Sequence, residues 1–197
     1  RSQLYHKENN RLSFWSSLFN LLVILVMIIF GGFALADNIA VSLNTNPVIT
    51  ALVFFGIIGF ASDIINIPFA WYDTFIIEKK YGFNTMKQGT FITDHLKSWA
   101  LALVIGIPVL GLITWFYYKT GENFWLYSWG LITLFSVFMN FFYSELIVPL
   151  FNKQMPLPGG ALRSSIEAFA EKAGFKLKDV YVIDGSRRST KANAYFS

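Results

Sequence analysis

The sequence predicts a mainly helical membrane protein with four transmembrane helices, followed by the start of an α+β domain outside the membrane. Of 197 residues, 54% are hydrophobic and only 14% are charged, and the mean hydropathy is +0.48. An ordinary soluble domain has about a quarter of its residues charged. The apolar residues are concentrated in four long runs, and the composition becomes polar and rich in turn residues from Lys153 onward.

Each apolar run is long enough to cross a bilayer. The runs cover residues 14–36, 47–77, 98–118 and 123–151. An α-helix rises 1.5 Å per residue, so about 20 residues span a hydrocarbon core of roughly 30 Å. The first and third runs contain no charged residue, whereas a soluble helix needs a polar face. Residues 1–152 are therefore predicted to be a transmembrane region in contact with the lipid bilayer.

The basic residues predict which way the chain crosses the membrane. Of the 16 Lys and Arg residues, Lys119 alone falls in a loop that follows an odd-numbered span. The rest lie before the first span, between the second and third, or after the fourth. Because cytoplasmic loops carry the excess of Lys and Arg, both ends are expected in the cytoplasm. The membrane would be a bacterial inner membrane or, in a eukaryote, that of the endoplasmic reticulum.

The composition also excludes several functions. A net charge of +4 is too small to indicate a nucleic-acid partner. The absence of cysteine excludes disulfides, thiolate zinc sites and cysteine nucleophiles. The two histidines, His6 and His95, are far apart in the sequence and form no zinc-binding motif. His95 follows Asp94, but neighbouring residues of a helix point apart, so a solvated or capping histidine is expected.

Residues 153–197 predict a small α+β unit. A proline- and glycine-containing linker, 155–160, leads to an amphipathic helix over 161–173. Strands are predicted over 180–183 and 191–196, with an Asp-Gly turn after the first. One helix and two short strands cannot bury a core of their own, so this unit needs a partner.

Polar residues inside the spans gather on two helix faces. They are Asp63, Asn66 and Asp73 on the second span, and Ser136, Asn140 and Ser144 on the fourth. At 100° per residue, each set falls within one arc of its helix. Such residues are costly in lipid and usually face a hydrated interior. The stripes are therefore expected to line a chamber or an ion path, or alternatively to form interhelical hydrogen bonds that fix the packing.

Two motif regions resemble a known family. The first is residues 75–84 (FIIEKKYGFN) with the residues that follow. Its motif positions are Glu78, Gly82, Phe83, Asn84, Asp94 and Lys97. The second region runs from 149 through 181–189 (YVIDGSRRS) to 191–196 (KANAYF). In this order and spacing, the two regions resemble the type I CAAX prenyl proteases, which are integral-membrane zinc metalloendopeptidases.

The resemblance implies a seven-helix ring around a water-filled chamber, closed on the cytoplasmic side by a zinc protease domain. The four predicted spans would be its second to fifth helices. Substrates would be prenylated or other membrane-associated proteins. The family holds its zinc with an H-E-x-x-H motif and a later glutamate, and no H-E-x-x-H occurs here. The chain is therefore expected to contain no catalytic residue and no metal ligand, to be inactive alone, and to need the remaining C-terminal protease segment.

The resemblance also implies a substrate-binding edge strand. Asn193, Ala194 and Tyr195 would bind an extended peptide, because edge strands pair with substrate through their backbone. The alternative is a core strand in which Ala192, Ala194 and Phe196 point inward. The basic pair Arg187-Arg188 would attract a substrate carboxylate or, alternatively, carry solvated turn charges.

Two other functions remain open from the residues alone. A small transporter or channel built on the polar stripes would predict an internal repeat, and the sequence contains none. A membrane anchor for a binding module would predict a tail that folds by itself.

Overall fold

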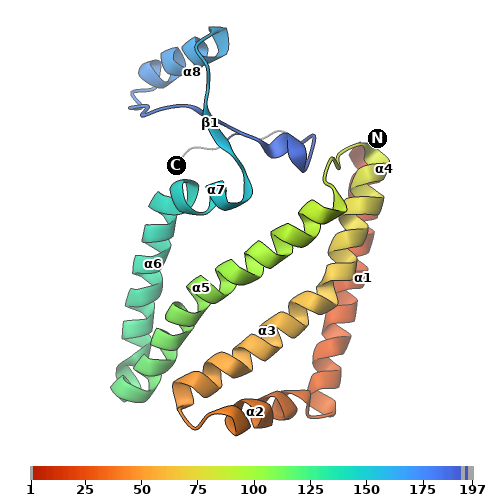
Figure 1. Cartoon of the computed structure of the whole chain (residues 1–197), viewed down its shortest axis with the longest axis vertical. Helices are drawn as coiled ribbons and strands as arrows, with labels where there is room; N and C mark the ends of the chain where they lie inside the picture. The colour runs from red at the N-terminus through yellow and green to blue at the C-terminus, as the bar shows by residue number, and fades with distance from the viewer. Residues whose placement is uncertain (1, 192–193, 195–197) are drawn as a thin grey trace.

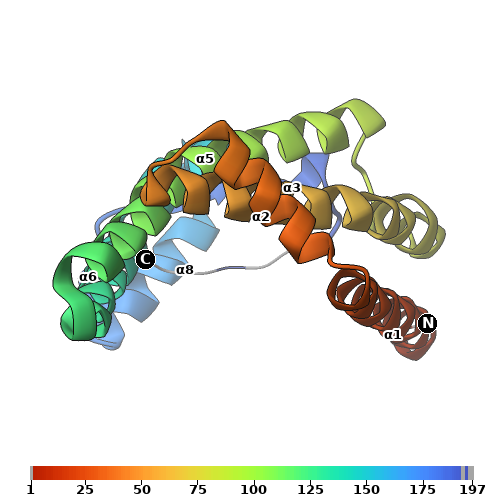
Figure 2. The same cartoon turned by 90° about the horizontal axis from the view of Figure 1, so that it is seen from below.

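Four long helices make up most of the molecule. The computed structural model describes residues 2–191 and residue 194. Within them, the long helices are α1 (Ser2–Ile29), α3 (Pro47–Tyr72), α5 (Gln88–Thr120) and α6 (Phe124–Leu146). They run between a shared lower end and a shared upper end in Figure 1. Seen from below, they form a curved row in the order α1, α3, α5, α6 (Figure 2).

The helices are long and apolar enough to cross a membrane. Three continuous helical stretches meet this criterion among the described residues: Ser2–Ile29, Pro47–Tyr81 and Gln88–Phe151. The last one contains α5 and α6, which fold back on each other at η2 (Gly121–Asn123). Side chains such as Leu134 and Val104 are 72% and 70% exposed. Apolar surface of this extent is stable only when lipid or further helices cover it.

The predicted helix over 14–36 is in fact two helices. α1 ends at Ile29, and α2 (Gly32–Leu43) crosses the ends of α1 and α3. Gly31 has φ 69°, a left-handed conformation that glycine adopts without steric cost. A Cβ on Gly32 would lie 2.3 Å from Met27 Sδ, so a larger residue there would require the flexible Met27 side chain to move.

The second helix continues beyond its predicted end. Asn46 caps α3, since its Oδ1 accepts hydrogen bonds from the backbone N–H groups of Val48 (2.9 Å) and Ile49 (3.5 Å). After Tyr72 the chain changes to a π-helical segment, η1 (Asp73–Glu78), and then to α4 (Lys79–Tyr81). Such π-helical segments are rare and are often found at functional sites.

The fourth predicted span, 123–151, is interrupted. α6 ends at Leu146, and a short helix, α7 (Val148–Phe151), follows. Pro149 lies in the first turn of α7, where its missing N–H costs no helical hydrogen bond. The third long helix, α5, is longer than the predicted range of 98–118. It begins at Gln88, because the polar residues before 98 are helical too, and it ends two residues later, at Thr120.

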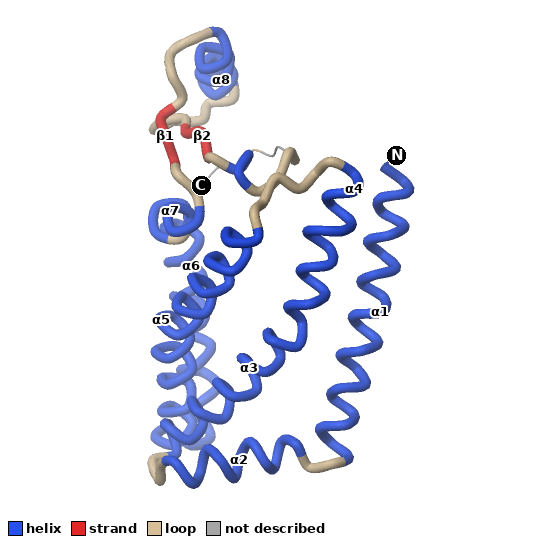
Figure 3. The backbone as a smooth tube through the Cα atoms, turned by 45° about the vertical axis from the view of Figure 1, so that its right-hand side comes forward, coloured by secondary structure: helices blue, strands red, loops and turns tan. Residues whose placement is uncertain are grey.

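The tail folds into a helix and a two-stranded sheet. β1 (Gln154–Pro156) and β2 (Tyr181–Ile183) pair antiparallel, and Met155 lies opposite Val182. β1 includes residues that the sequence assigned to a linker. α8 (Ala161–Lys172) corresponds to the helix predicted over 161–173. After η3 (Gly185–Arg187), the strand predicted over 191–196 falls largely outside the described residues; Lys191 and Ala194 belong to no regular element. Figure 3 places the tail at the same end as α4 and the N-terminus.

Candidate functional site

The two motif regions lie against each other, although about a hundred positions separate them. Asn84 and Ser189 form an isolated antiparallel bridge. On either side of it, the Thr85 N–H donates to Arg188 O (3.2 Å) and the Thr190 N–H donates to Phe83 O (2.9 Å). We call this contact, formed by residues 78–85, Asp94 and residues 184–191, the junction. It attaches the tail to the loop between α4 and α5.

Arg188 connects the tail to two other elements. Its Nε and Nη2 donate to Asp94 Oδ2 (2.7 Å) and Oδ1 (2.9 Å), and its Nη1 donates to Asn152 Oδ1 (2.8 Å). The Arg188 and Asp94 side chains are 21% and 17% exposed. The hydrogen bonds to Asp94 raise the pKa of Arg188 above its already high usual value. Such a planar, two-point contact fixes orientation as well as distance.

Lys191 makes the second charged contact at the junction. Its ammonium group donates to Glu78 Oε1 (2.6 Å) and to Tyr5 Oη (2.7 Å). The same group lies 4.6 Å from the ring centre of Tyr5 and 5.0 Å from that of Phe83, within cation–π distance. Burial lowers the pKa of Lys191, but the hydrogen bonds to Glu78 and Tyr5 outweigh it, and the net pKa is raised. Lys191 therefore stays charged at neutral pH.

A cluster of aromatic side chains packs next to the Lys191 ammonium group. Tyr5, at the start of α1, is 8% exposed. Its ring packs edge-on against Tyr81 and Phe83, with centroids 5.5 and 5.0 Å apart. Aromatic pairs in this geometry contribute about 0.5–1.5 kcal/mol each beyond the area they bury. The start of α1, the loop after α4 and the tail thus meet in one place.

The motif positions have clear structural roles. Gly82 has φ 79° and ends α4, so that the N–H groups of Phe83 (2.8 Å) and Asn84 (3.3 Å) turn back to Glu78 O. Asn84 Oδ1 accepts a hydrogen bond from the Met86 N–H (2.6 Å). Lys97 is outside the junction; its Nζ donates to Leu150 O (2.8 Å) and links α5 to α7.

The polar residues of the second span contact different neighbours. Asp63 Oδ2 accepts from Trp99 Nε1 of α5 (2.6 Å). Asn66 exchanges hydrogen bonds with Asn20 of α1, at 2.9 and 3.2 Å. Asp73 Oδ1 is buried and has no hydrogen-bond partner among the described residues. Asp63 and Asn66 therefore form the interhelical hydrogen bonds of the packing alternative.

Among the described residues, the polar side chains of the fourth span form no hydrogen bond with another long helix. Ser136 and Asn140 are exposed, and Ser144 is half-buried. The Ser144 hydroxyl is buried without a partner in the described part of the chain, while its carbonyl accepts from Gln154 Nε2 (3.0 Å). Their role as chamber-lining residues stays a prediction.

Of the predicted substrate-binding residues, Asn193 and Tyr195 lie outside the described residues. Ala194 is described and exposed. Arg188 is neither solvated nor open to a substrate carboxylate, because Asp94 and Asn152 occupy its guanidinium group. Arg187 remains 63% exposed.

The described residues do not fit a zinc ion. Among residues 2–191 and 194, no three His, Asp or Glu side chains lie close enough together to hold a metal. His95 Nδ1 lies 2.9 Å from Phe91 O, one turn back in its own helix, and its ring packs on Phe91 at 4.3 Å.

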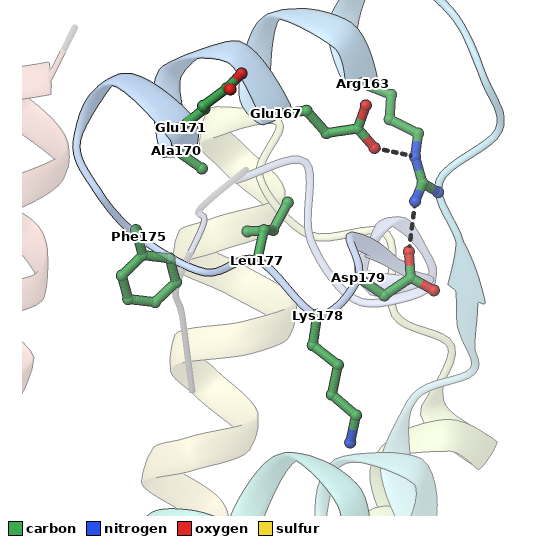
Figure 4. A pocket seen from close by; sticks show the side chains of 8 residues that line it. All are labelled: Arg163, Glu167, Ala170, Glu171, Phe175, Leu177, Lys178 and Asp179. Carbon is green, nitrogen blue, oxygen red and sulfur yellow. Dashed lines mark hydrogen bonds and ion pairs between the residues drawn. The ribbon is translucent and has the colours of Figure 1, made fainter.

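A hollow of about 320 Å³ lies between α8 and the segment that follows it (Figure 4). Arg163 closes one side, since its Nε and Nη2 bind Glu167 Oε1 (2.7 Å) and Asp179 Oδ1 (2.8 Å). This bridge holds α8 to the segment before β2, and we assign the hollow no ligand.

Several contacts made by the junction had no local signal in the sequence. Tyr5 lies more than 180 positions from Lys191, and no local pattern singles it out. Asn152 and Arg188 were part of the resemblance, but their contact with each other was not predicted. The acidic motif positions Glu78 and Asp94 were the available signal, because charged residues beside a membrane usually have a partner.

Fold and junction together define a multi-span helical membrane protein with a tail anchored on its helices. Comparison with known proteins narrows this class. Residues 1–153 match the family model described as "CAAX prenyl protease N-terminal, five membrane helices". The chain therefore belongs to the CAAX prenyl protease family.

Individual relatives agree with this assignment. The chain is 34% identical to CAAX prenyl protease 1 homolog of Mus musculus over 203 aligned positions, which cover 100% of the chain and 43% of the relative. For CAAX prenyl protease 1 of Saccharomyces cerevisiae, the identity is 33% and the shares are 100% and 46%. The crystal structure of S. mikatae Ste24p superimposes with a TM-score of 0.92 at 34% identity, covering 99% of this chain and 46% of that one. The chain thus spans less than half the length of these relatives.

Proposed function

We propose that this chain is the membrane and substrate-entry part of a zinc metalloendopeptidase of the CAAX prenyl protease type. The whole protein would cleave peptide bonds in prenylated or other membrane-associated proteins. The observation that carries this proposal is the junction, where the two family motif regions bind each other through Asp94–Arg188 and Glu78–Lys191. An unrelated transporter, channel or anchor would not need these two regions to meet.

Within this proposal, Asn193, Ala194 and Tyr195 bind an extended substrate peptide. Backbone pairing sets the register of such a peptide, and alternate side chains read its sequence. Asn193 would add a side-chain hydrogen bond. Ser136, Asn140 and Ser144 would line the path by which a polar peptide reaches these residues, together with Asp73.

The zinc chemistry belongs to a part of the protein other than these 197 residues. The sequence has no H-E-x-x-H motif, in which two histidines bind zinc and the glutamate acts as general base. When bound, the zinc ion would activate water for attack on the peptide bond. This chain would place the substrate and keep the reaction at the membrane surface.

The protease side is proposed to be cytoplasmic. The basic segments around the α1 start, α4 and the tail lie at one end of the molecule (Figure 1). At the other end of the molecule, the turn of the α5–α6 hairpin carries Lys119, in the last turn of α5, and Glu122, in η2. By the positive-inside rule, this distribution supports an orientation in which the end with the tail is cytoplasmic.

A cleavage assay tests the proposal. The full-length protein should cleave a prenylated reporter peptide, lose this activity with a zinc chelator and regain it with added zinc. The 197-residue chain should show no cleavage under the same conditions. Zinc-dependent cleavage by the purified chain, or none by the full-length protein, would contradict the proposal.

The substrate-binding role of Asn193 is tested separately. Asn193→Ala in the full-length protein should lower kcat/KM by about 5- to 100-fold, as for the loss of one peptide hydrogen bond. Its zinc content should stay at one ion per protein, measured by mass spectrometry. Unchanged kinetics would remove Asn193 from the substrate site.

A further inference from the structure

The short helix α2 lies across the molecule at the end opposite the tail (Figure 3). It has 12 residues, Gly32–Leu43, which rise about 18 Å. This length is too short to cross a hydrocarbon core of roughly 30 Å. The helix packs on α3, and Ala36 and Ala40, one turn apart, are 3% and 0% exposed. α2 therefore connects two spans along one end of the helix row and is not itself a span.

The neighbouring segments place α2 at one boundary of the hydrocarbon core. Arg11 is the last charged residue of α1, which ends at Ile29. The segment between them rises about 27 Å, close to the thickness of the core, which is roughly 30 Å. The turn after α2 is polar, since it consists of Asn44, Thr45 and Asn46, and the last two are exposed. α2 therefore lies at the depth where acyl chains give way to headgroups and water.

α2 has one apolar half and one mainly polar half. The apolar half combines the two buried alanines with three exposed side chains: Leu35, Ile39 and Leu43. The opposite half holds the polar side chains Asp37, Asn38 and Ser42. Each of these two sets falls within an arc of about 140° at 3.6 residues per turn. Val41 is the one large apolar side chain on the polar half.

The exposed apolar stripe of α2 continues that of α1. Leu35 and Leu43 are 63% and 66% exposed, and at the end of α1 the exposure of Ile29 reaches 72%. On the other half, Asp37 is exposed and makes no hydrogen bond or ion pair with any described residue, so its carboxylate needs water. A helix with water on one side and exposed apolar side chains on the other matches the surface of a bilayer.

Hydrogen bonds at both ends hold α2 in this orientation. At its start, the Leu35 N–H donates to the carbonyl of Gly31 (2.9 Å), the residue that turns the chain through a left-handed conformation. At its end, Thr50 Oγ1 of α3 donates to Asn44 O (2.9 Å), and the Asn46 N–H donates to Asn44 Oδ1 (2.7 Å). The apolar half of α2 thus keeps a fixed direction relative to the spans.

We propose that α2 is an interfacial helix that binds lipid at the membrane surface opposite the tail. Leu35, Ile39 and Leu43 lie among the acyl chains just below the headgroups, whereas Asp37 and Asn38 face water. The partner of this face is the bilayer, and not a further segment of protein. Lipid bound here also holds the ends of α1 and α3 at a fixed depth, because moving the apolar half into water is unfavourable. This role does not depend on the protease activity proposed above.

Spin labels on single cysteines test which medium covers each half. Ile39→Cys and Asn38→Cys are made in the full-length protein, with any cysteine outside these 197 residues replaced by serine, and are reconstituted in phosphatidylcholine vesicles. Collisions with oxygen, which dissolves in lipid, and with a water-soluble nickel chelate give the depth of each label. The Ile39 label should lie about 5–10 Å below the headgroup boundary. The label on the adjacent Asn38 is the matched control and should be in water.

Two results would overturn the proposal. If the nickel chelate reaches the Ile39 label as readily as the Asn38 label, water covers the apolar half. If neither reagent reaches the Ile39 label, a segment of protein covers it. Should Ile39→Cys not fold, Leu35→Cys tests the same half and should report the same depth. Neither measurement requires cleavage of a peptide, so failure of the proposed function would leave both readable.

Discussion

At the scale of single residues, the membrane part depends on a few polar pairs between helices. Asn20 of α1 and Asn66 of α3 exchange two hydrogen bonds at 2.9 and 3.2 Å. Interhelical hydrogen bonds in membrane proteins contribute about 0.6 kcal/mol on average and up to about 1.7. The cost of breaking one is larger when the remaining amide is left unpaired in an apolar environment.

We therefore expect Asn66→Leu to destabilise the chain by about 0.5–2 kcal/mol. The double variant Asn20→Leu/Asn66→Leu should recover part of this loss, because no amide is then left unpaired. Asn140→Leu is the control, since Asn140 is exposed and its side chain has no hydrogen bond among the described residues. Unfolding in detergent, monitored by circular dichroism, gives the free energy of unfolding of the wild type and of the three variants. Equal stability of Asn66→Leu and Asn140→Leu would contradict the prediction.

In the tail, Asp179 predicts a pH dependence. Its Oδ1 accepts from the Val180 N–H (2.7 Å) and from Arg163 Nη2 (2.8 Å), and these hydrogen bonds lower the pKa of Asp179. The unfolded pKa is about 3.9. Because the folded pKa is the lower one, the carboxylate stabilises the tail above about pH 4 and ceases to do so as the pH falls through the folded pKa.

An NMR titration checks that the pKa of Asp179 is lowered. The chemical shift of the Val180 amide should follow Asp179 and give a midpoint below about 3.9. In Asp179→Asn the transition should disappear. In Arg163→Gln the midpoint should rise toward the unfolded value, because one of the two hydrogen bonds is lost. A midpoint above that value in the wild type would refute the assignment.

At the scale of secondary structure, one glycine decides where the first helix ends. Gly31 has φ 69°, and a Cβ added there would meet no atom within 4 Å. Gly56, inside α3, also has open space around a Cβ, but it is helical. The two sites therefore differ in backbone conformation and not in room.

Alanine at these glycines should act in opposite directions. Gly31→Ala is expected to destabilise the chain by about 1–2 kcal/mol, because a left-handed conformation is unfavourable for residues with a Cβ. Gly56→Ala should stabilise it by about 0.5–1 kcal/mol through helix propensity. Thermal unfolding in the same detergent compares them. A Tm of Gly31→Ala at or above that of Gly56→Ala would show that α1 and α2 do not need this bend.

At the scale of the whole molecule, the basic segments gather at one end and the α5–α6 hairpin turn lies at the other (Figure 1). For this charge distribution, the positive-inside rule predicts one orientation in the bilayer. Because the chain has no cysteine, a single introduced cysteine reports unambiguously which side it is on.

We expect Lys178→Cys and Glu122→Cys to react from opposite sides of the membrane. Lys178 is 96% exposed in the tail, and Glu122 is exposed in the hairpin turn. In sealed vesicles with the cytoplasmic face outward, a membrane-impermeant maleimide should label Lys178→Cys. It should label Glu122→Cys only after detergent is added. The reverse pattern would invert the proposed orientation.

Local patterns predicted the elements whose stability is local. The helix over 161–173 was recognised from its apolar stripe and is observed as Ala161–Lys172. β1 was not recognised, because its three residues include a proline and are stable only through pairing with β2, far along the chain. The two adjacent glycines, Gly31 and Gly32, were a sequence signal for a break in the helix. The uncharged run around them nevertheless predicted one continuous span.

Hydropathy, counted residue by residue, was enough to identify a membrane protein, because the free energy of transfer into lipid adds up along a segment and needs no knowledge of neighbours. The charges at the junction could not be assigned in this way. Arg188 was expected to be either solvated or bound to substrate, whereas it binds Asp94, 94 positions away. An ion pair depends on the distance between two side chains, and the folding of the helices and the loop after α4 sets that distance.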